Sequence, residues 1–268
     1  MAKTLKEWIE TDVNKVRDQP VSWLSEYYFF RDPNRFNYVD SGYFFSPADG
    51  IIIYQSVVEP DECLVNIKGR SYSLRDALRD DSYDRTSLVI GVFMTFFDVH
   101  VNRIPYSGRL SYREFEPIDT ENRPMLDVEK GILDDLRIST EEADYLRQNQ
   151  RIVNRIDVPD FHGAYYILQI ADYDVNLITP FELKQNQPVQ QGERFSQIRY
   201  GSQVDLIIPL SEEYDFIPLQ KIGDHVEGGI DPLVHVREKA DETSSDSVAR
   251  QERRVRGLNG AMEERRVE

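Results

Sequence analysis

Residues Ile198–Pro209, with the sequence IRYGSQVDLIIP, contain a Gly-Ser step between two segments rich in apolar residues. Apolar residues recur at every second position after the Gly201-Ser202 step, and Pro209 ends the run because proline cannot donate a ladder hydrogen bond. The pattern predicts a strand, a glycine-serine step and a second strand. Because Gly201 has no Cβ, its backbone can adopt angles that leave its carbonyl carbon open to the Ser202 hydroxyl.

Such an arrangement favours attack of the chain on itself. Ser202 would take over the Gly201 acyl group as an ester, and β-elimination would then break the chain. Hydrolysis of the resulting dehydroalanine would leave a pyruvoyl group at the new N-terminus. Most Gly-Ser pairs between strands are ordinary turns or bulges, so the surrounding motifs have to decide between the two interpretations.

Composition limits the classes of partner. The 268 residues include 48 acidic and 32 basic side chains, a net charge of −16, which argues against a nucleic-acid partner and against simple electrostatic adhesion to anionic lipid. No run approaches the roughly 18 apolar residues of a spanning helix, and the N-terminus lacks the apolar stretch of a signal peptide. We expect a cytoplasmic protein, soluble or peripheral at a membrane. The four histidines show no regular metal-ligand spacing, so no metal is expected.

The hydrophobic pattern predicts an α+β fold that is mostly β. Residues 87–97 are almost continuously apolar, which indicates a strand buried on both faces. Further strands are expected at 51–58, 109–116, 165–171 and 175–178. An amphipathic helix is expected over 4–17, and the charged stretch 119–151 reads as a partly helical insertion with a solvated acidic face.

Three segments are expected along the chain. Residues 1–20 form the N-terminal amphipathic helix, 21–237 a single domain, and 238–268 a flexible tail. Residues 222–229, IGDHVEGG, look like the hairpin of biotinyl and lipoyl carrier modules, although no lysine stands at its tip for modification. We therefore predict a β core of the barrel-sandwich-hybrid type without carrier chemistry.

Several motifs occur together with the Gly-Ser step: FFRDPNR at 29–35, SPADG at 46–50, FDVHVNRIPYSG at 97–108 and GERF at 192–195. Together they resemble the phosphatidylserine decarboxylase family, particularly its shorter branch, over about residues 29–229. In that family a Gly-Ser bond of this kind is the processing site. The resemblance implies a zymogen that cleaves itself between Gly201 and Ser202 into a larger N-terminal and a smaller C-terminal chain, and whose cofactor is the pyruvoyl group made from Ser202.

The resemblance also implies a carboxy-lyase of phospholipid biosynthesis. Such an enzyme converts phosphatidylserine to phosphatidylethanolamine and carbon dioxide through a Schiff base, with the pyruvoyl group as electron sink. Two alternatives stay open: a decarboxylase of a soluble amino acid, and an unprocessed, non-catalytic binding protein of the same fold. The expected partner is a phospholipid or an amino acid, with peripheral membrane contact and a homo-oligomer both left open.

The family motifs indicate three catalytic residues. Ser202 is the cleavage and pyruvoyl residue, and His100 is the working acid or base. A lone histidine is usually a core residue, but the flanking match favours function here. Asp49 lies beside the cleavage site in the family, and we expect it to orient and charge-stabilise a histidine, as in a serine-type triad.

One departure from the family concerns a second histidine. The other branch carries two histidines three residues apart in the 97–108 motif, whereas this chain has Arg103 at the second position. Arg103 or Asn102 could instead hold the phosphate or carboxylate of the substrate, and an exposed structural salt bridge is the competing interpretation. His162 is the reserve candidate for a second proton carrier.

The N-terminal region is rich in aromatic residues, from Trp8 to Phe30. Aromatic side chains suit membrane interfaces, so this region is the expected lipid dock, although it lacks a basic face. We expect removal of the residues up to Asp18 to weaken binding to liposomes.

Overall fold

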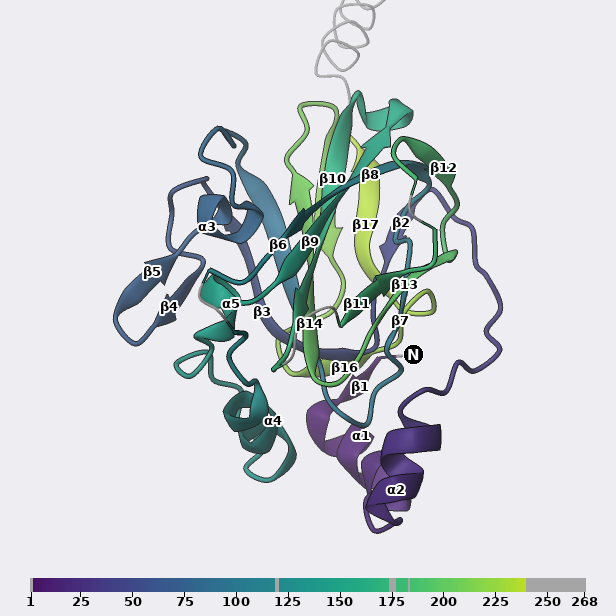
Figure 1. Ribbon diagram of the computed structural model, residues 1–268. Helices are drawn as coiled ribbons and strands as arrows, with labels where there is room; N and C mark the ends of the chain where they lie inside the picture. Colours follow the sequence, from purple (N-terminus) through teal and green to yellow (C-terminus); the bar gives the residue numbers. More distant parts are fainter. Residues whose placement is uncertain (1, 119–120, 174–176, 183, 240–268) are drawn as a thin grey trace, which may run out of the picture. The chain divides into compact units, whose positions relative to one another are not determined.

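The computed structural model describes residues 2–118, 121–173, 177–182 and 184–239. Its centre is a nine-stranded sheet in which every neighbouring pair is antiparallel (Figure 1). The strands follow the order β1 (Lys3–Thr4), β16 (Asp224–Val226), β3 (Gly50–Val58), β6 (Ser87–Met94), β14 (Ser202–Pro209), β10 (Gly163–Ala171), β9 (Arg151–Val158), β8 (Gly108–Phe115) and β12 (Gln187–Val189). The strand that begins at Ser202 is thus the middle one.

Three smaller sheets accompany the large one. Their strands are β11 (Ile178–Pro180), β13 (Arg194–Ile198) and β7 (Val101–Arg103) in the first, β15 (Tyr214–Pro218), β17 (Pro232–Glu238) and β2 (Tyr43–Phe45) in the second, and β4 (Val65–Ile67) with β5 (Arg70–Tyr72) in the third. The helical elements are short. They are α1 (Leu5–Thr11), a 3-10 turn (Val13–Lys15), α2 (Val21–Trp23), a π turn (Leu24–Tyr28), α3 (Leu74–Leu78), α4 (Leu126–Leu133), α5 (Tyr145–Gln148) and a second 3-10 turn (Pro159–Phe161).

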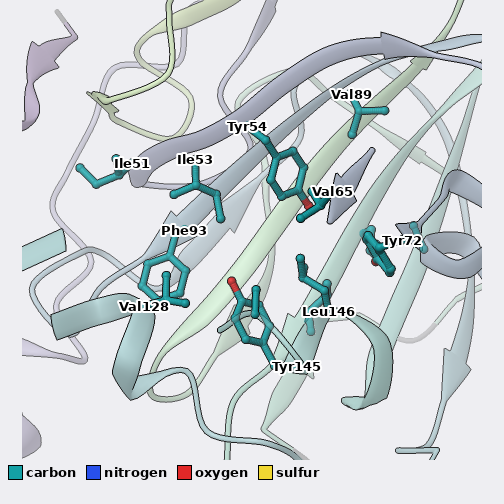
Figure 2. Packing of buried hydrophobic residues seen from close by; sticks show 14 of the residues in the cluster. Ile51, Ile53, Tyr54, Val65, Tyr72, Val89, Phe93, Val128, Tyr145 and Leu146 are labelled. Atoms are coloured by element: carbon teal, nitrogen blue, oxygen red, sulfur yellow. The ribbon is translucent and has the colours of Figure 1, made fainter. Parts of the chain in front are cut away.

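The two faces of the large sheet are covered by different elements. Side chains of a strand alternate between faces, so Val89 and Phe93 of β6 join one core with residues of α1, α3, α4 and α5. Figure 2 shows part of this core, including Val128 of α4 and Tyr145 and Leu146 of α5. Ile90 and Val92 of the same strand join a second core with residues of β2, β13 and β17. Every residue of β6 is buried, which confirms the two-sided burial predicted from its continuous apolar run.

The fold class predicted from the sequence is confirmed: the chain is α+β and mostly β, with several antiparallel sheets and no closed barrel among the described residues. The strand, the Gly-Ser step and the second strand correspond to β13, residues 199–201 and β14. The insertion is partly helical through α4 and α5. Part of the strand expected at 175–178, and nearly all of the tail expected from 238, lie outside the described residues, so the domain boundary at 237 stays a prediction.

The N-terminal helix is shorter than predicted. Thr4 caps it, and the expected apolar face is buried through Leu5 and Trp8, but the helix ends at Thr11 instead of near residue 17. Asp12 leaves the helical conformation because its carboxylate accepts hydrogen bonds from the Lys3 ammonium at 2.5 Å and the Thr11 hydroxyl at 2.6 Å. The π turn that follows α2 has no counterpart in the prediction.

The centre of the sheet allows a test of packing. Gly91 on β6 faces the buried ring of Tyr54, and a Cβ at position 91 would lie 2.5 Å from that ring. We expect Gly91→Ala to lower the free energy of unfolding by about 1–3 kcal/mol through overpacking, measured by urea denaturation in a Ser202→Ala background, which excludes the cleavage expected at Ser202.

The matched control is Gly163→Ala in β10, where the nearest atom would lie 3.6 Å away. We expect a change within about 0.5 kcal/mol there. Equal unfolding midpoints for the two variants would contradict the packing described for Gly91.

Candidate active site

Ser202 begins the middle strand and is fully buried. Antiparallel pairing places it opposite Met94 of β6 on one side and Ala171 of β10 on the other. Its hydroxyl oxygen lies 3.3 Å from His100 Nδ1, 3.4 Å from the Tyr200 carbonyl oxygen and 3.4 Å from Met94 Sδ. The structure therefore brings together Ser202 and His100, as predicted from the two motifs.

The link before Ser202 is conformationally restricted. Tyr200 has a φ of 64°, which is unfavourable for a bulky side chain. A Cβ on Gly201 would lie 2.7 Å from Asp172 Oδ2, so a larger residue there would have to displace the Asp172 carboxylate. Burial raises the pKa of Asp172 to about 6, and its other carboxylate oxygen accepts a hydrogen bond from the Met125 N–H. Gly201, which provides the acyl group of the Gly201-Ser202 bond, therefore follows the strained residue Tyr200 and lies next to the Asp172 carboxylate.

The contacts of His100 define its tautomer. Nε2 lies 3.0 Å from the Thr95 carbonyl oxygen, which can only accept a hydrogen bond. Nε2 therefore carries the proton, and the lone pair of Nδ1 faces the Ser202 hydroxyl. Burial lowers the pKa of His100 to about 4, outweighing the opposite effect of the Asp98 and Asp49 charges. The ring is thus neutral at physiological pH and able to take a proton from Ser202.

The turn from Thr95 to Asp98 connects β6 to His100. Asp98 Oδ2 accepts hydrogen bonds from the Thr95 N–H and the Thr95 hydroxyl, each at 2.8 Å. Asp98 Oδ1 lies 2.7 Å from Nε2 of His225, whose ring stacks on Trp8 with centroids 4.5 Å apart. Arg31 donates to the carbonyl oxygens of Phe97 and Asp98, at 2.6 and 3.2 Å. Sequence reasoning missed the buried Asp98–His225 pair.

Asp49 is buried, but its contacts differ from those expected. Its carboxylate forms a two-pronged ion pair with Arg35, with both oxygen-to-nitrogen distances 2.6 Å, and accepts from the Gly228 N–H at 2.7 Å. Both ring nitrogens of His100 are engaged by Ser202 and Thr95. Asp49 therefore does not orient His100 through a hydrogen bond, and the Thr95 carbonyl orients the ring instead. A charge-stabilising role of Asp49 stays a prediction.

Asn102 and Arg103, the predicted substrate-binding residues, lie buried on β7. The Asn102 carbonyl accepts from Gln169 Nε2 at 2.6 Å. Arg103 donates to the Gly192 carbonyl at 2.9 Å, and its side chain is only 4% exposed. Arg103 also forms a salt bridge with Asp32 at 3.7 Å, as the competing interpretation expected, but its side chain is buried and not exposed. Because protein groups already engage both side chains, their contact with substrate stays a prediction.

His162, the reserve proton carrier, lies far from Ser202. It precedes the first residue of β10, whereas the last residue of that strand, Ala171, pairs with Ser202. Eight residue steps along a strand correspond to about 26 Å. A cavity of about 720 Å³ lies at this far end and includes His162 in its lining. The prediction that His162 serves as a second proton carrier at Ser202 is therefore wrong.

A smaller cavity, of about 200 Å³, lies next to the turn that holds His100. Its lining includes Arg31, Arg35, Asp49, Asp98 and His225. Phe29 covers His100 from the N-terminal side, with ring centroids 4.1 Å apart, and lies 5.8 Å from Tyr200. These aromatic contacts complete the enclosure of a site in which Ser202 and His100 have no exposed surface.

Within the described residues, no group of three or more histidine, cysteine, aspartate or glutamate side chains is arranged to hold a metal ion. None of the described helices combines the length and apolar character needed to cross a membrane.

The family model described as phosphatidylserine decarboxylase matches residues 26–232. Phosphatidylserine decarboxylase proenzymes of Pelagibacter ubique and Erythrobacter litoralis are each 32% identical to the chain, over 74% and 72% of its length and 73% and 68% of theirs. A protein of Methanothermobacter thermautotrophicus, whose name assigns it provisionally as an archaetidylserine decarboxylase proenzyme, is 30% identical over 68% of this chain and 69% of its own.

The buried serine, its neutral histidine and the glycine before them therefore occur in a chain that matches decarboxylase proenzymes over most of its length. The chain belongs to the phosphatidylserine decarboxylase family, a family of carboxy-lyases.

The state of His100 gives a prediction about pH. Nδ1 can accept the Ser202 proton only while the ring is neutral, and burial lowers its pKa from 6.5 to about 4. We expect the rate of any cleavage at Gly201-Ser202 to be lost as pH falls through about 4, with no loss near 6.5. Gel electrophoresis of freshly made precursor across this range measures the rate, and circular dichroism of Ser202→Ala shows where acid unfolds the chain. An acidic limb near 6.5 in folded protein would contradict the assignment.

Proposed function

We propose that the chain is a proenzyme that cleaves itself at Gly201-Ser202, acquires a pyruvoyl group from Ser202, and then decarboxylates phosphatidylserine to phosphatidylethanolamine. The observation that carries the proposal is the contact of the Ser202 hydroxyl with the unprotonated Nδ1 of His100, next to a glycine whose added Cβ would meet the Asp172 carboxylate. The family membership and the proenzyme names of the relatives support it.

The cleavage can be followed atom by atom. His100 takes the hydroxyl proton, the Ser202 oxygen attacks the Gly201 carbonyl carbon, and the carbon–nitrogen bond breaks as the nitrogen takes a proton. Removal of the Ser202 α-proton then expels the Gly201 carboxylate, and water hydrolyses the resulting dehydroalanine with loss of ammonia. The N-terminal product then ends in the carboxylate of Gly201.

The new N-terminus fits the site. It would begin the middle strand, where the Met94 and Ala171 backbones fix its position and His100 stays within reach. When present, a pyruvoyl carbonyl condenses with a primary amine and withdraws electrons as carbon dioxide leaves. To protonate the decarboxylated carbon, His100 would first have to take up a proton on Nδ1, and burial would keep bulk water from competing.

The first experiment compares cleavage among variants. We expect Ser202→Ala to remain one chain, and His100→Gln to cleave at least about 100-fold more slowly than wild type because the general base is lost. His162→Asn is the matched control, because this histidine lies at the far end of β10, and it should cleave at the wild-type rate. Wild-type speed in His100→Gln would contradict the assigned base.

The substrate is tested separately with the matured protein. We expect release of carbon dioxide from carboxyl-labelled phosphatidylserine in mixed micelles, and none from free serine or aromatic amino acids. Release from an amino acid alone would favour the soluble-substrate alternative. A wild-type chain that never cleaves would favour the non-catalytic binding protein.

A lipid substrate would have to reach the buried site from a membrane, and the N-terminal segment carries exposed apolar side chains next to that site. Val21, Tyr27 and Phe36 are 77%, 68% and 85% exposed, while Phe29 in the same segment packs on His100. The apolar side chains of α1 are buried, so deletion up to Asp18 would remove core residues. We therefore place the proposed membrane contact on residues 21–39 instead of on α1.

We expect Val21→Ser combined with Tyr27→Ser to weaken binding to phosphatidylserine-containing liposomes by about tenfold, because two exposed apolar groups no longer enter the interface. The control is Val57→Ser with Leu210→Ser. These two exposed residues lie at the C-terminal ends of β3 and β14, away from the ends that carry Asp49 and Ser202. Sedimentation with liposomes measures the effect. Equal binding of both double variants would rule out this docking surface.

A further inference from the structure

The carboxylate of Asp98 is the central acceptor of the turn that precedes His100. It is 1% exposed, and both of its oxygens are used: Oδ2 by the N–H and hydroxyl of Thr95, and Oδ1 by Nε2 of His225. Burial alone would raise the pKa of Asp98, but the His225 charge and the Thr95 hydrogen bonds outweigh it, so the pKa is lowered. The geometry and the charge both favour an ionised carboxylate.

The Thr95 carbonyl is the only group that fixes the proton of His100 on Nε2 among the hydrogen bonds of the described residues. The direction in which the Thr95 carbonyl points depends on the backbone turn from Thr95 to Asp98. Two hydrogen bonds from Thr95 to the Asp98 carboxylate close this turn, and the Asp98 N–H also donates to the Thr95 carbonyl at 3.0 Å. Loss of the carboxylate would remove its two hydrogen bonds from Thr95 and its contact with His225, and would so loosen this turn. The ring could then rotate or change tautomer, and Nδ1 would no longer face Ser202.

His225 comes from a distant part of the sequence and is held in two ways. Its backbone pairs with Ile51 of β3 and with Lys3 of β1, and its ring stacks on Trp8 of α1. Arg103, which occupies the position of a second histidine in the other branch, donates to Gly192 instead of to this turn. The histidine that contacts this turn is therefore His225 of β16, which lies outside the motif that contains His100.

We propose that Asp98, paired with His225, is a positioning residue for the reaction at Ser202: it closes the Thr95–Asp98 turn and so fixes the ring and tautomer of His100. Neither residue touches the reacting atoms, and both act through the Thr95 carbonyl. The inference rests on the proposed self-cleavage for its kinetic consequence, but its geometric content can be measured in an uncleaved chain.

The first test uses nuclear magnetic resonance of nitrogen-15-labelled histidine in Ser202→Ala. The chain has four histidines, so replacing each in turn assigns the His100 signals. We expect a single tautomer of His100 with the proton on Nε2, and a mixture of tautomers when Asp98→Ala is added. A His100 signature that Asp98→Ala leaves unchanged would overturn the proposal.

The second test follows cleavage in the chain with Ser202 in place. We expect Asp98→Ala to slow cleavage about tenfold or more, because hydrogen bonds to a charged group are lost. Asp98→Asn keeps one acceptor oxygen and should fall between Asp98→Ala and wild type. At the partner position, His225→Gln keeps a donor toward Asp98 and should cleave faster than His225→Leu.

The matched control is Asp205→Asn. Asp205 is another fully buried carboxylate, bonded to Tyr54 and Gln203 on the helix-covered face of β14. We expect it to change neither the His100 tautomer nor the cleavage rate, with thermal melting confirming that each variant folds. Slower cleavage in Asp98→Ala without any change at His100 would reduce Asp98 to a structural residue and overturn the proposal. If wild type itself does not cleave, the proposed function fails, while the tautomer measurement still decides the positioning role.

Discussion

The chemistry of this site depends on a single hydrogen bond, from His100 Nε2 to the Thr95 carbonyl oxygen at 3.0 Å. A carbonyl cannot donate, so the bond leaves the lone pair of Nδ1 for the Ser202 hydroxyl. The bond has this effect because Ser202 and His100 have no exposed surface: both faces of the sheet are covered, and the Phe29 ring packs on His100. In water the same histidine would exchange tautomers and titrate near its usual pKa. The left-handed conformation of Tyr200 adds strain of about 1–3 kcal/mol next to the proposed cleavage site.

The long strands β3, β6, β8, β10 and β14 and the two central residues of the site could be predicted from the sequence because each has a local signal. The continuous apolar run of β6 and the alternation in β14 reflect burial, and short motifs surround Ser202 and His100. Partnerships between distant residues have no such signal. Asp98 and His225 are 127 positions apart, and they meet only because the three-residue β16 pairs with β3.

The remaining errors have equally local causes. Asp49 was expected to orient a histidine, but Arg35 and Gly228 take both of its oxygens. The N-terminal helix was expected to continue to residue 17, but hydrogen bonds from Lys3 and Thr11 draw Asp12 out of it. In both cases a charged side chain found a partner that hydrophobic periodicity does not report.

The measurement that most directly tests the central claim is the intact mass of freshly purified wild-type protein under denaturing conditions. The account predicts two chains, one ending at Gly201 and one beginning at residue 202 that is lighter by one ammonia than a chain with a free serine at its N-terminus. Borohydride should then add hydrogen to the smaller chain alone. A single full-length mass that persists, with no carbonyl that borohydride can reduce, would contradict self-cleavage at Ser202.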